Sequence, residues 1–194
     1  IDKTDIRDIS LESLRDNIAV VFQDNFLFAG TIRDNILLGK EDATEEEIAT
    51  AVKMACLDEF INELENGLDT KIGERGSLLS GGQRQALTLL MAALRTPKLL
   101  LLDEHTAALD PKTAAKVLEL TEKIVAEQKL TAMMVTHNMK DAIAMGNRLI
   151  MMNAGRIVVD VRGEEKKKLT REDLMQLFEK AAGQEIENDR MLLS

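Results

Sequence analysis

The sequence of 194 residues contains no tryptophan, no tyrosine and a single cysteine, Cys56. One cysteine excludes an internal disulfide and fits a reducing compartment such as the cytosol. No apolar run approaches ~20 residues, so the sequence encodes no transmembrane helix. The net charge of −9 gives no general attraction to DNA or RNA. At 45% hydrophobic residues, the chain is nevertheless able to bury a core.

The run Ser80-Gly81-Gly82-Gln83 predicts the start of a helix. Serine is a good N-cap, and the stretch from Gln83 to Arg95 has few helix breakers. The two glycines let a phosphate approach backbone N–H groups, and a helix N-terminus supplies partial positive charge toward that anion. A lone Ser-Gly-Gly is at least as often a simple loop-to-helix turn as a phosphate-binding site, so the neighbouring motifs decide between these two interpretations.

Two acidic residues, Asp103 and Glu104, follow the apolar run Leu99 to Leu102. Such a run is typical of a strand buried in a mainly parallel sheet. Ligands of open α/β sheets collect at the carboxyl ends of the strands, so both carboxylates are expected beside a bound nucleotide. Asp103 suits a Mg²⁺ shell and Glu104 the polarisation of an attacking water. On their own, the two acids could also be a solvated helix start.

Two further strands are predicted to end in polar residues. Thr131 to Val135 leads to His137, and Ile18 to Phe22 leads to Gln23. A histidine at a strand end is more often structural than functional, and a glutamine there is unremarkable. Farther along the chain, Asp110 is predicted to cap a helix whose first residue is Pro111.

Taken together and in this order, these motifs resemble those of an ABC-type ATPase. The family's motifs are matched by Gln23 (Q-loop), Ser80 to Gln83 (signature loop), Asp103 and Glu104 (Walker B), Ala107 to Asp110 (D-loop) and His137 (switch histidine). The resemblance implies an α/β fold with a P-loop NTPase-like core, a mainly parallel sheet, a helical subdomain, and a C-terminal hairpin and helix. It also implies ATP and Mg²⁺ as ligands.

The resemblance assigns a role to each matched residue. Catalysis falls to Glu104, His137 and Gln23; nucleotide binding to Ser80, Gly81, Gly82, Gln83 and Asp110; and the metal to Asp103 and Gln23. In the family the signature loop serves an ATP held by a second protomer. The implied partners are therefore a second ABC ATPase domain in a head-to-tail dimer and a transmembrane domain or subunit, with no nucleic acid. The implied location is the cytoplasmic face of the cell membrane.

One motif of the family is missing. A Walker A loop reads G-x-x-x-x-G-K-[ST], but the only Gly-Lys pair, Gly39-Lys40, has Asp34 in place of the first glycine. The chain has no Trp or Tyr, so the aromatic residue that normally stacks on adenine in this family is missing as well, unless a Phe from elsewhere takes its place. We expect the sequence to be N-terminally truncated and the isolated chain to have negligible ATPase activity. The alternatives are a non-catalytic subunit that supplies only the signature half-site, and a translation-linked ABC ATPase.

The chain shows two subfamily patterns. Residues 1–76 resemble exporters, whose ATPase follows a membrane domain in one chain, whereas residues 80–194 resemble stand-alone importer-type subunits. This change suggests a mosaic sequence with a junction near residues 68–80, in which the exporter-like part sets the membrane partner.

The predicted organisation is one ABC ATPase domain, residues 1–194. Within it, residues 25–80 form the helical subdomain, and residues 81–194 form the RecA-like core and the C-terminal extension. The remaining predictions are helices from Leu11 to Asp16, from the Thr44 cap through Met54, from Leu57 to Leu64 and from Thr170 to Ala182; a hairpin of Arg148 to Asn153 with Arg156 to Val161; a solvated loop at Lys166 to Lys168; and packing of Cys56 within a helix. His105 receives no catalytic role.

Overall fold

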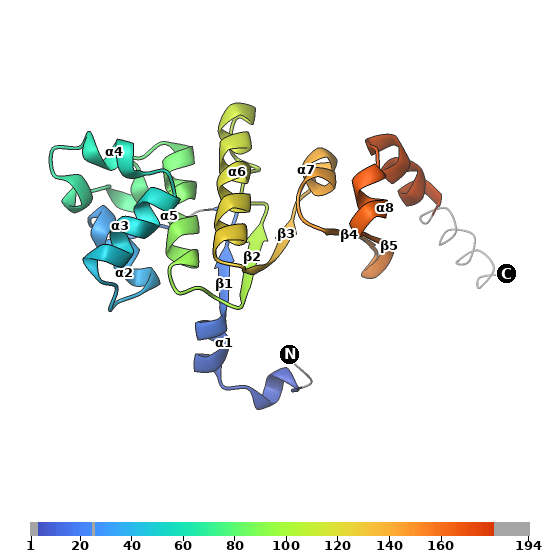
Figure 1. The fold of residues 1–194 in the computed structure, drawn as a ribbon, viewed down its shortest axis with the longest axis horizontal. Coiled ribbons are helices and arrows are strands. Elements are labelled where there is room, and N and C mark those ends of the chain that lie inside the picture. Colours follow the sequence, from blue (N-terminus) through green and yellow to red (C-terminus); the bar gives the residue numbers. More distant parts are fainter. Residues whose placement is uncertain (1–3, 25, 181–194) are drawn as a thin grey trace. The chain divides into compact units, whose positions relative to one another are not determined.

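The computed structural model describes residues 4–24 and 26–180 (Figure 1). The chain divides into two compact units, Ile1–Val135 and Thr136–Ser194. Each unit has a hydrophobic core of its own. Over the described ranges, no helix is both long and apolar enough to cross a lipid bilayer.

The first unit contains a small sheet and most of the helices. Its strands are β1 (Ile18–Val21), β2 (Leu99–Asp103) and β3 (Thr131–Val135). Its α-helices are α1 (Leu11–Asn17), α2 (Ile32–Gly39), α3 (Glu45–Met54), α4 (Asp58–Asn62), α5 (Gly81–Ala93) and α6 (Pro111–Glu127), and its 3-10 turns are η1 (Ile6–Asp8), η2 (Gly67–Asp69) and η3 (Glu74–Gly76). The second unit contains α7 (Met139–Ala144), β4 (Arg148–Asn153), β5 (Arg156–Arg162) and α8 (Gly163–Lys168), followed by helical residues 171–180.

The sheet of the first unit is parallel, with the order β1-β2-β3. Val21 lies opposite Leu102, and Asp103 lies opposite Val135. All three strands therefore end at one edge of the sheet, where the sequence places its polar motifs. β2 is the central strand, and its Leu100 and Leu102 are fully buried.

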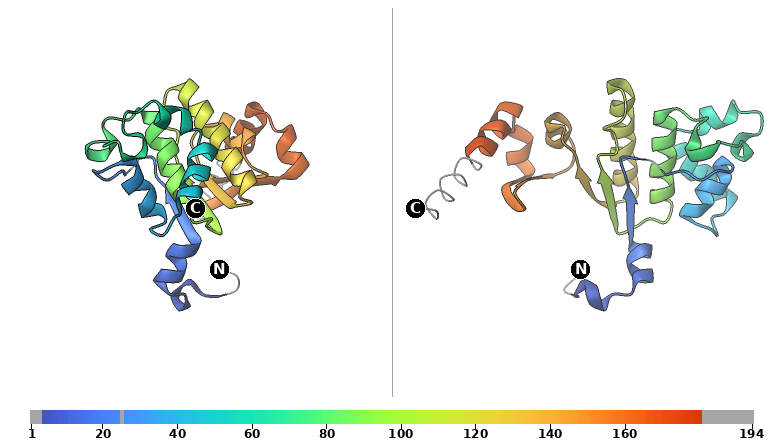
Figure 2. Two further views of the ribbon diagram at one scale, coloured as in Figure 1. Left: turned by 60° about the vertical axis from the view of Figure 1, so that its left-hand side comes forward. Right: turned by 180° about the vertical axis from the view of Figure 1, so that it is seen from behind.

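Helix α5 lies at the centre of this unit. It packs against β1, α2 and α6, and Figure 2 shows it beside α6 from a second direction. Its buried face is formed by Gln85, Ala86, Leu87, Leu89, Leu90 and Ala93. This apolar face explains why the helix forms here, because burying its leucines stabilises it far more than its intrinsic propensity does.

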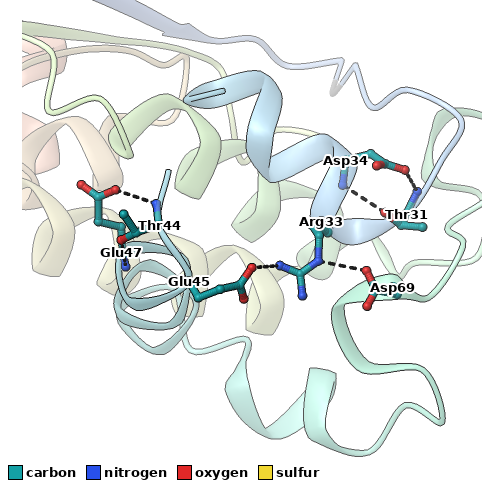
Figure 3. A network of polar contacts seen from close by, with 7 residues as sticks. All are labelled: Thr31, Arg33, Asp34, Thr44, Glu45, Glu47 and Asp69. Atoms are coloured by element: carbon teal, nitrogen blue, oxygen red, sulfur yellow. Dashed lines mark hydrogen bonds and ion pairs between the residues drawn. The ribbon is translucent and has the colours of Figure 1, made fainter. Parts of the chain in front are cut away.

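A polar network joins α2 to α3 and to η2 (Figure 3). Arg33 of α2 bonds the carboxylate of Glu45 at the start of α3 and, at 2.9 Å, that of Asp69 in η2. The two helices begin at capping boxes, formed by Thr31 with Asp34 and by Thr44 with Glu47. Exposed ion pairs stabilise a fold by about 0–1 kcal/mol each, so this network mainly fixes the orientation of the helices.

The second unit is built on an antiparallel hairpin. β4 and β5 pair with a bulge between Met151 and Met152. Leu149, Val159 and Val161 of the hairpin form a core with Leu174 of the helical residues 171–180. Thr170 caps these residues through reciprocal bonds with Asp173. The predicted hairpin and the start of the last helix are confirmed, whereas its predicted end lies outside the described residues.

The prediction of a solvated loop at Lys166 to Lys168 is wrong. These residues end α8, and Lys166 is buried. Its ammonium group donates hydrogen bonds to the carbonyl oxygens of Ile143 and, at 2.8 Å, Met145. The carbonyl groups at the end of α7 have no hydrogen-bond donor within that helix, and the Lys166 ammonium supplies one. The side chain can be buried because its aliphatic stem is apolar.

The predicted packing of Cys56 within a helix is also wrong. Cys56 is exposed and has a left-handed φ of 53°, which interrupts the helical conformation between α3 and α4. Its neighbours Ala55 and Leu57 are buried. The turn directs these two residues into the core and leaves the thiol in solvent.

Candidate functional site

The acidic pair lies at the carboxyl end of the central strand. Asp103 is the last residue of β2 and is exposed, while Glu104 is half-buried. Glu104 has a left-handed φ of 46°, a conformation that side chains rarely adopt outside turns. Its N–H donates to the carbonyl of Val135 at 3.0 Å, and its own carbonyl accepts from Ala107 at 2.9 Å. The backbone that carries the carboxylate is therefore held on both sides.

Gln23 follows β1, the neighbouring strand. Because Val21 pairs with Leu102, residues two positions beyond them, Gln23 and Glu104, emerge at the same edge of the sheet. Gln23 is exposed there. This register brings the proposed Q-loop and Walker B residues to one edge.

His137 belongs to the second unit, which begins one residue after β3. It is exposed and precedes Asn138, the N-cap of α7. Asn138 accepts a hydrogen bond from the N–H of Lys140 at 3.0 Å. The place of His137 in the site remains a prediction.

The signature run forms the predicted start of a helix. The Ser80 hydroxyl oxygen accepts from the N–H of Gln83 at 3.3 Å, and the Gln83 side-chain oxygen accepts from the N–H of Ser80 at 2.8 Å. This capping box fixes the first turn of α5. Since the Ser80 oxygen acts as an acceptor in the box, its hydroxyl proton can be donated to a ligand.

The two glycines allow α5 to approach the start of α6. A Cβ on Gly81 would lie 3.1 Å from the Leu109 side chain, and one on Gly82 only 2.6 Å from Cγ2 of Thr113. The N-termini of the two helices are therefore neighbours. Asp110 caps α6 by accepting N–H bonds from Lys112 and Thr113, both at 3.1 Å. The bonds from Thr113 are the main reason that the pKa of Asp110 is lowered.

Comparison with known proteins identifies the family. A sequence model described as ABC transporter matches residues 1–107, more than half of the chain. The chain belongs to the ABC transporter family. It is an ABC transporter ATP-binding domain, as its motifs predicted.

Individual ABC proteins are similar over most of the chain. The tyrosine transport ATP-binding protein of Clostridioides difficile is 42% identical over 191 residues, covering 93% of this chain and 74% of that protein. The ATP-dependent lipid A-core flippase of Desulfotalea psychrophila is 43% identical over 169 residues, covering 87% of this chain and 29% of the flippase. This chain therefore spans less than a third of the flippase.

A solved ABC transporter structure confirms the fold. The structure of a bacterial Atm1-family ABC exporter with ATP bound matches with a TM-score of 0.74 and 34% identity, covering 84% of this chain and 28% of that one. The predicted α/β architecture of an ABC ATPase is thus confirmed.

One residue of the ABC domain that received no role from the sequence stands out in the structure. His105 follows Glu104 and is only 2% exposed. Its Nε2 lies 3.1 Å from Oγ1 of Thr121, on the buried face of α6. Burial lowers the pKa of the imidazole to about 4, so the ring is neutral near pH 7. A threonine among the apolar positions of α6 was the sequence signal for such a partner.

The residues of the ABC domain offer Mg²⁺ a partial shell. Throughout residues 4–24 and 26–180, no three His, Cys, Asp or Glu side chains gather closely enough to hold a metal ion by themselves. The donor set at the sheet edge is the exposed Asp103 carboxylate and the Gln23 amide. This set fits Mg²⁺, which typically takes one or two carboxylates and fills its other positions with phosphate oxygens and water.

Proposed function

We propose that this domain hydrolyses ATP as one half of a head-to-tail dimer of ABC ATPase domains and thereby powers a transmembrane domain or subunit. The supporting observation is the acidic pair at the end of β2, where the backbone of Glu104 is held by hydrogen bonds to Val135 and Ala107. The family assignment supports ATP as the substrate.

In this proposal Glu104 accepts a proton from the attacking water, because a carboxylate fixed at the ligand edge suits general-base chemistry. His137 contacts the γ-phosphate, and Gln23 orients the water. Asp103 and Gln23 would hold Mg²⁺, which neutralises charge on the phosphate oxygens when bound. The side chains at the sheet edge thus divide proton transfer, water placement and metal binding among them.

The signature residues serve the nucleotide of the partner domain. Ser80 donates its hydroxyl proton to a phosphate oxygen, and the N–H groups of Gly81, Gly82 and Gln83 at the start of α5 add partial positive charge. Asp110, at the neighbouring start of α6, lies beside this half-site because Gly82 and Thr113 are in close contact.

An exposed aromatic pair supports a membrane partner. The rings of Phe26 and Phe28 meet edge to face with centroids 4.8 Å apart, and both side chains are exposed. They follow Gln23 closely in sequence, so a partner that covers them would sense the state of the Q-loop. A membrane partner would hold the domain at the cytoplasmic face of the membrane. The net charge of −9 argues against nucleic acid as a ligand.

The mosaic hypothesis remains part of the proposal. Relatives named as a flippase and as exporters match this chain alongside one named as a tyrosine transport ATP-binding protein. We infer that residues 1–76 select an exporter-type membrane partner, and that the helical subdomain of residues 25–80 carries the contact. Residues 81–194 form the catalytic core and the C-terminal extension.

Glu104→Gln tests the proposed function. In the assembled transporter that contains this domain, the substitution keeps the side-chain shape and removes the base, so kcat for ATP should fall by at least about 100-fold. Glu104→Asp, which retains a carboxylate on a shorter stem, should keep part of the activity. Full turnover by the Gln variant would remove Glu104 from the mechanism.

A second candidate is a non-catalytic subunit that supplies only the signature half-site, whose first turn is fixed by the Ser80–Gln83 capping box. A catalytic domain would in addition need a G-x-x-x-x-G-K-[ST] loop. The preorganised amides and lysine of that loop supply most of the electrostatic contact with phosphates. Both candidates predict negligible ATPase for the isolated 194 residues. They differ in the assembled transporter, where a non-catalytic subunit tolerates Glu104→Gln but loses activity on Ser80→Arg. The translation-linked alternative predicts ribosome binding, measurable by co-sedimentation.

A further inference from the structure

The hydrogen bond between His105 and Thr121 has a defined direction. The Thr121 hydroxyl donates its single proton to the carbonyl of Val117 at 2.8 Å. Its oxygen is then the acceptor of the 3.1 Å contact with His105, so Nε2 of the imidazole carries a proton and donates it. The geometry therefore selects the Nε2–H tautomer.

This bond joins the acidic turn to α6. Glu104 occupies the left-handed region, where a side chain is strained unless its surroundings hold it. Backbone bonds fix its N–H to Val135 and its carbonyl to Ala107. The next residue is fixed by its side chain, since the ring of His105 is buried and bonded to α6.

We propose that His105 is a positioning residue that holds the backbone of Glu104 in its left-handed turn through the Nε2–H···Oγ1 bond to Thr121. This inference rests on the proposed role of Glu104. An apolar side chain would fill the buried position beside Thr121 of α6 but would form no directional contact with it. A buried hydrogen bond adds direction, since it is strong only over a narrow range of distance and angle.

The same helix reaches the signature half-site. α6 begins at Pro111, with Asp110 as its N-cap, and its Thr113 lies against Gly82 of α5. His105 therefore fastens the acidic turn to the helix against which the signature loop packs. A shift of that turn would alter its distance from the dimer interface.

Three variants test the proposal in the assembled transporter. His105→Leu removes the donor, Thr121→Val removes the acceptor, and His105→Gln restores an N–H donor at a similar reach. We expect the Leu and Val variants to lose kcat by about tenfold or more at unchanged KM for ATP, because small misplacements of a reacting group carry such costs. The Gln variant should retain most of the wild-type kcat, and the Leu/Val double variant should be no worse than either single one.

Two results would overturn the proposal. One is a wild-type kcat in His105→Leu. The other is an equal loss of kcat in His105→Leu and His105→Gln that parallels their loss of thermal stability, because it would show a purely structural role. Glu104→Gln is assayed in parallel. Full activity in that variant refutes the proposed function, whereas an inactive Glu104→Gln with a fully active His105→Leu refutes only the positioning role.

A measurement on the unsubstituted chain covers the case in which a variant fails to fold. The ¹⁵N shifts of the His105 ring distinguish its tautomers, and amide hydrogen exchange reports the bond from Glu104 to Val135. We expect the Nε2–H form and a protected amide. A ring that carries its proton on Nδ1 alone, or a Glu104 amide without protection, would contradict the proposal.

Discussion

The Asp160 carboxylate in β5 lies between two guanidinium groups. Arg148 donates to it through Nε at 2.8 Å and Nη2 at 2.7 Å, and Arg162 adds a contact at 3.2 Å. The bonds from Arg148 are the main reason that the pKa of Asp160 falls from 3.8 to about 2. A carboxyl whose pKa is lower in the folded state contributes stability above its unfolded pKa, and this contribution is lost as the pH falls through the folded value.

We therefore predict that Asp160 titrates with a midpoint near 2 in the native chain, and that Arg148→Leu moves the midpoint most of the way to 3.8. Arg162→Leu is the matched control and should move it less, because Arg162 makes one longer contact. The carboxyl ¹³C shift followed against pH measures both. Equal shifts in the two variants would contradict the assignment of Arg148 as the main partner.

The roles of single residues differ in how far the sequence reveals them. Glu104 and Ser80 lie in contiguous motifs, so their positions at the end of β2 and the start of α5 could be predicted. His105 and Lys166 bond partners that are distant in sequence, namely Thr121 for the histidine and the end of α7 for the lysine. Local sequence carries little information about such contacts.

At the scale of elements, the contact between α5 and α6 restricts what position 82 can hold. A methyl group on Gly82 would lie 2.6 Å from Cγ2 of Thr113, and the β-branched side chain of a threonine in a helix has few other rotamers. Alanine is otherwise favoured over glycine within a helix by about 1 kcal/mol. The steric cost and the propensity gain therefore oppose each other.

We predict that the steric term dominates and that Gly82→Ala lowers the free energy of unfolding by about 1–3 kcal/mol, the usual cost of overpacking. Thr113→Ala removes Cγ2 and should recover most of that loss in the double variant. Urea denaturation of the wild type, the two single variants and the double variant gives the free energies of unfolding for a double-mutant cycle. Additive effects would show that the two residues do not meet.

Element boundaries followed from local chemistry wherever a cap defined them. Thr44 and Ser80 each precede a helix and accept N–H bonds from its first turn, and both helices begin where predicted. The ends are less clearly marked: the stretch with few helix breakers runs on to Arg95, whereas α5 stops at Ala93. The predicted end of the helix capped by Thr44, Met54, is confirmed, and Cys56 then adopts a left-handed conformation without being a glycine.

At the scale of the whole molecule, the sequence predicted the core and the C-terminal extension together, as residues 81–194, without a boundary between them. In the structure, two compact units, Ile1–Val135 and Thr136–Ser194, meet after β3 in sequence. The strand pairing shows how this arises. β3 pairs with β2, whereas β4 pairs with β5. Pairing partners depend on contacts between distant segments, which residue patterns along one strand do not encode.

The outer edge of β3 leads to a prediction about association. Within the described part of the chain, β3 pairs only with β2, and its Met133 is 57% exposed and its Val135 47% exposed. Apolar side chains on an edge strand favour pairing with another chain. We predict that the isolated 194 residues self-associate with rising concentration and that Met133→Lys reduces this. Light scattering after size exclusion measures it, with Leu38→Lys, at an exposed position of α2, as the matched control.

The same edge bears on how the chain reaches its folded state. A parallel sheet forms from segments far apart in sequence, so β3 spends time exposed before its helices cover the sheet. During that interval, intermolecular pairing competes with productive folding, and only the first process accelerates with protein concentration. The yield of native protein on refolding from denaturant should therefore rise as the protein concentration is lowered, and should depend less on the time allowed for refolding.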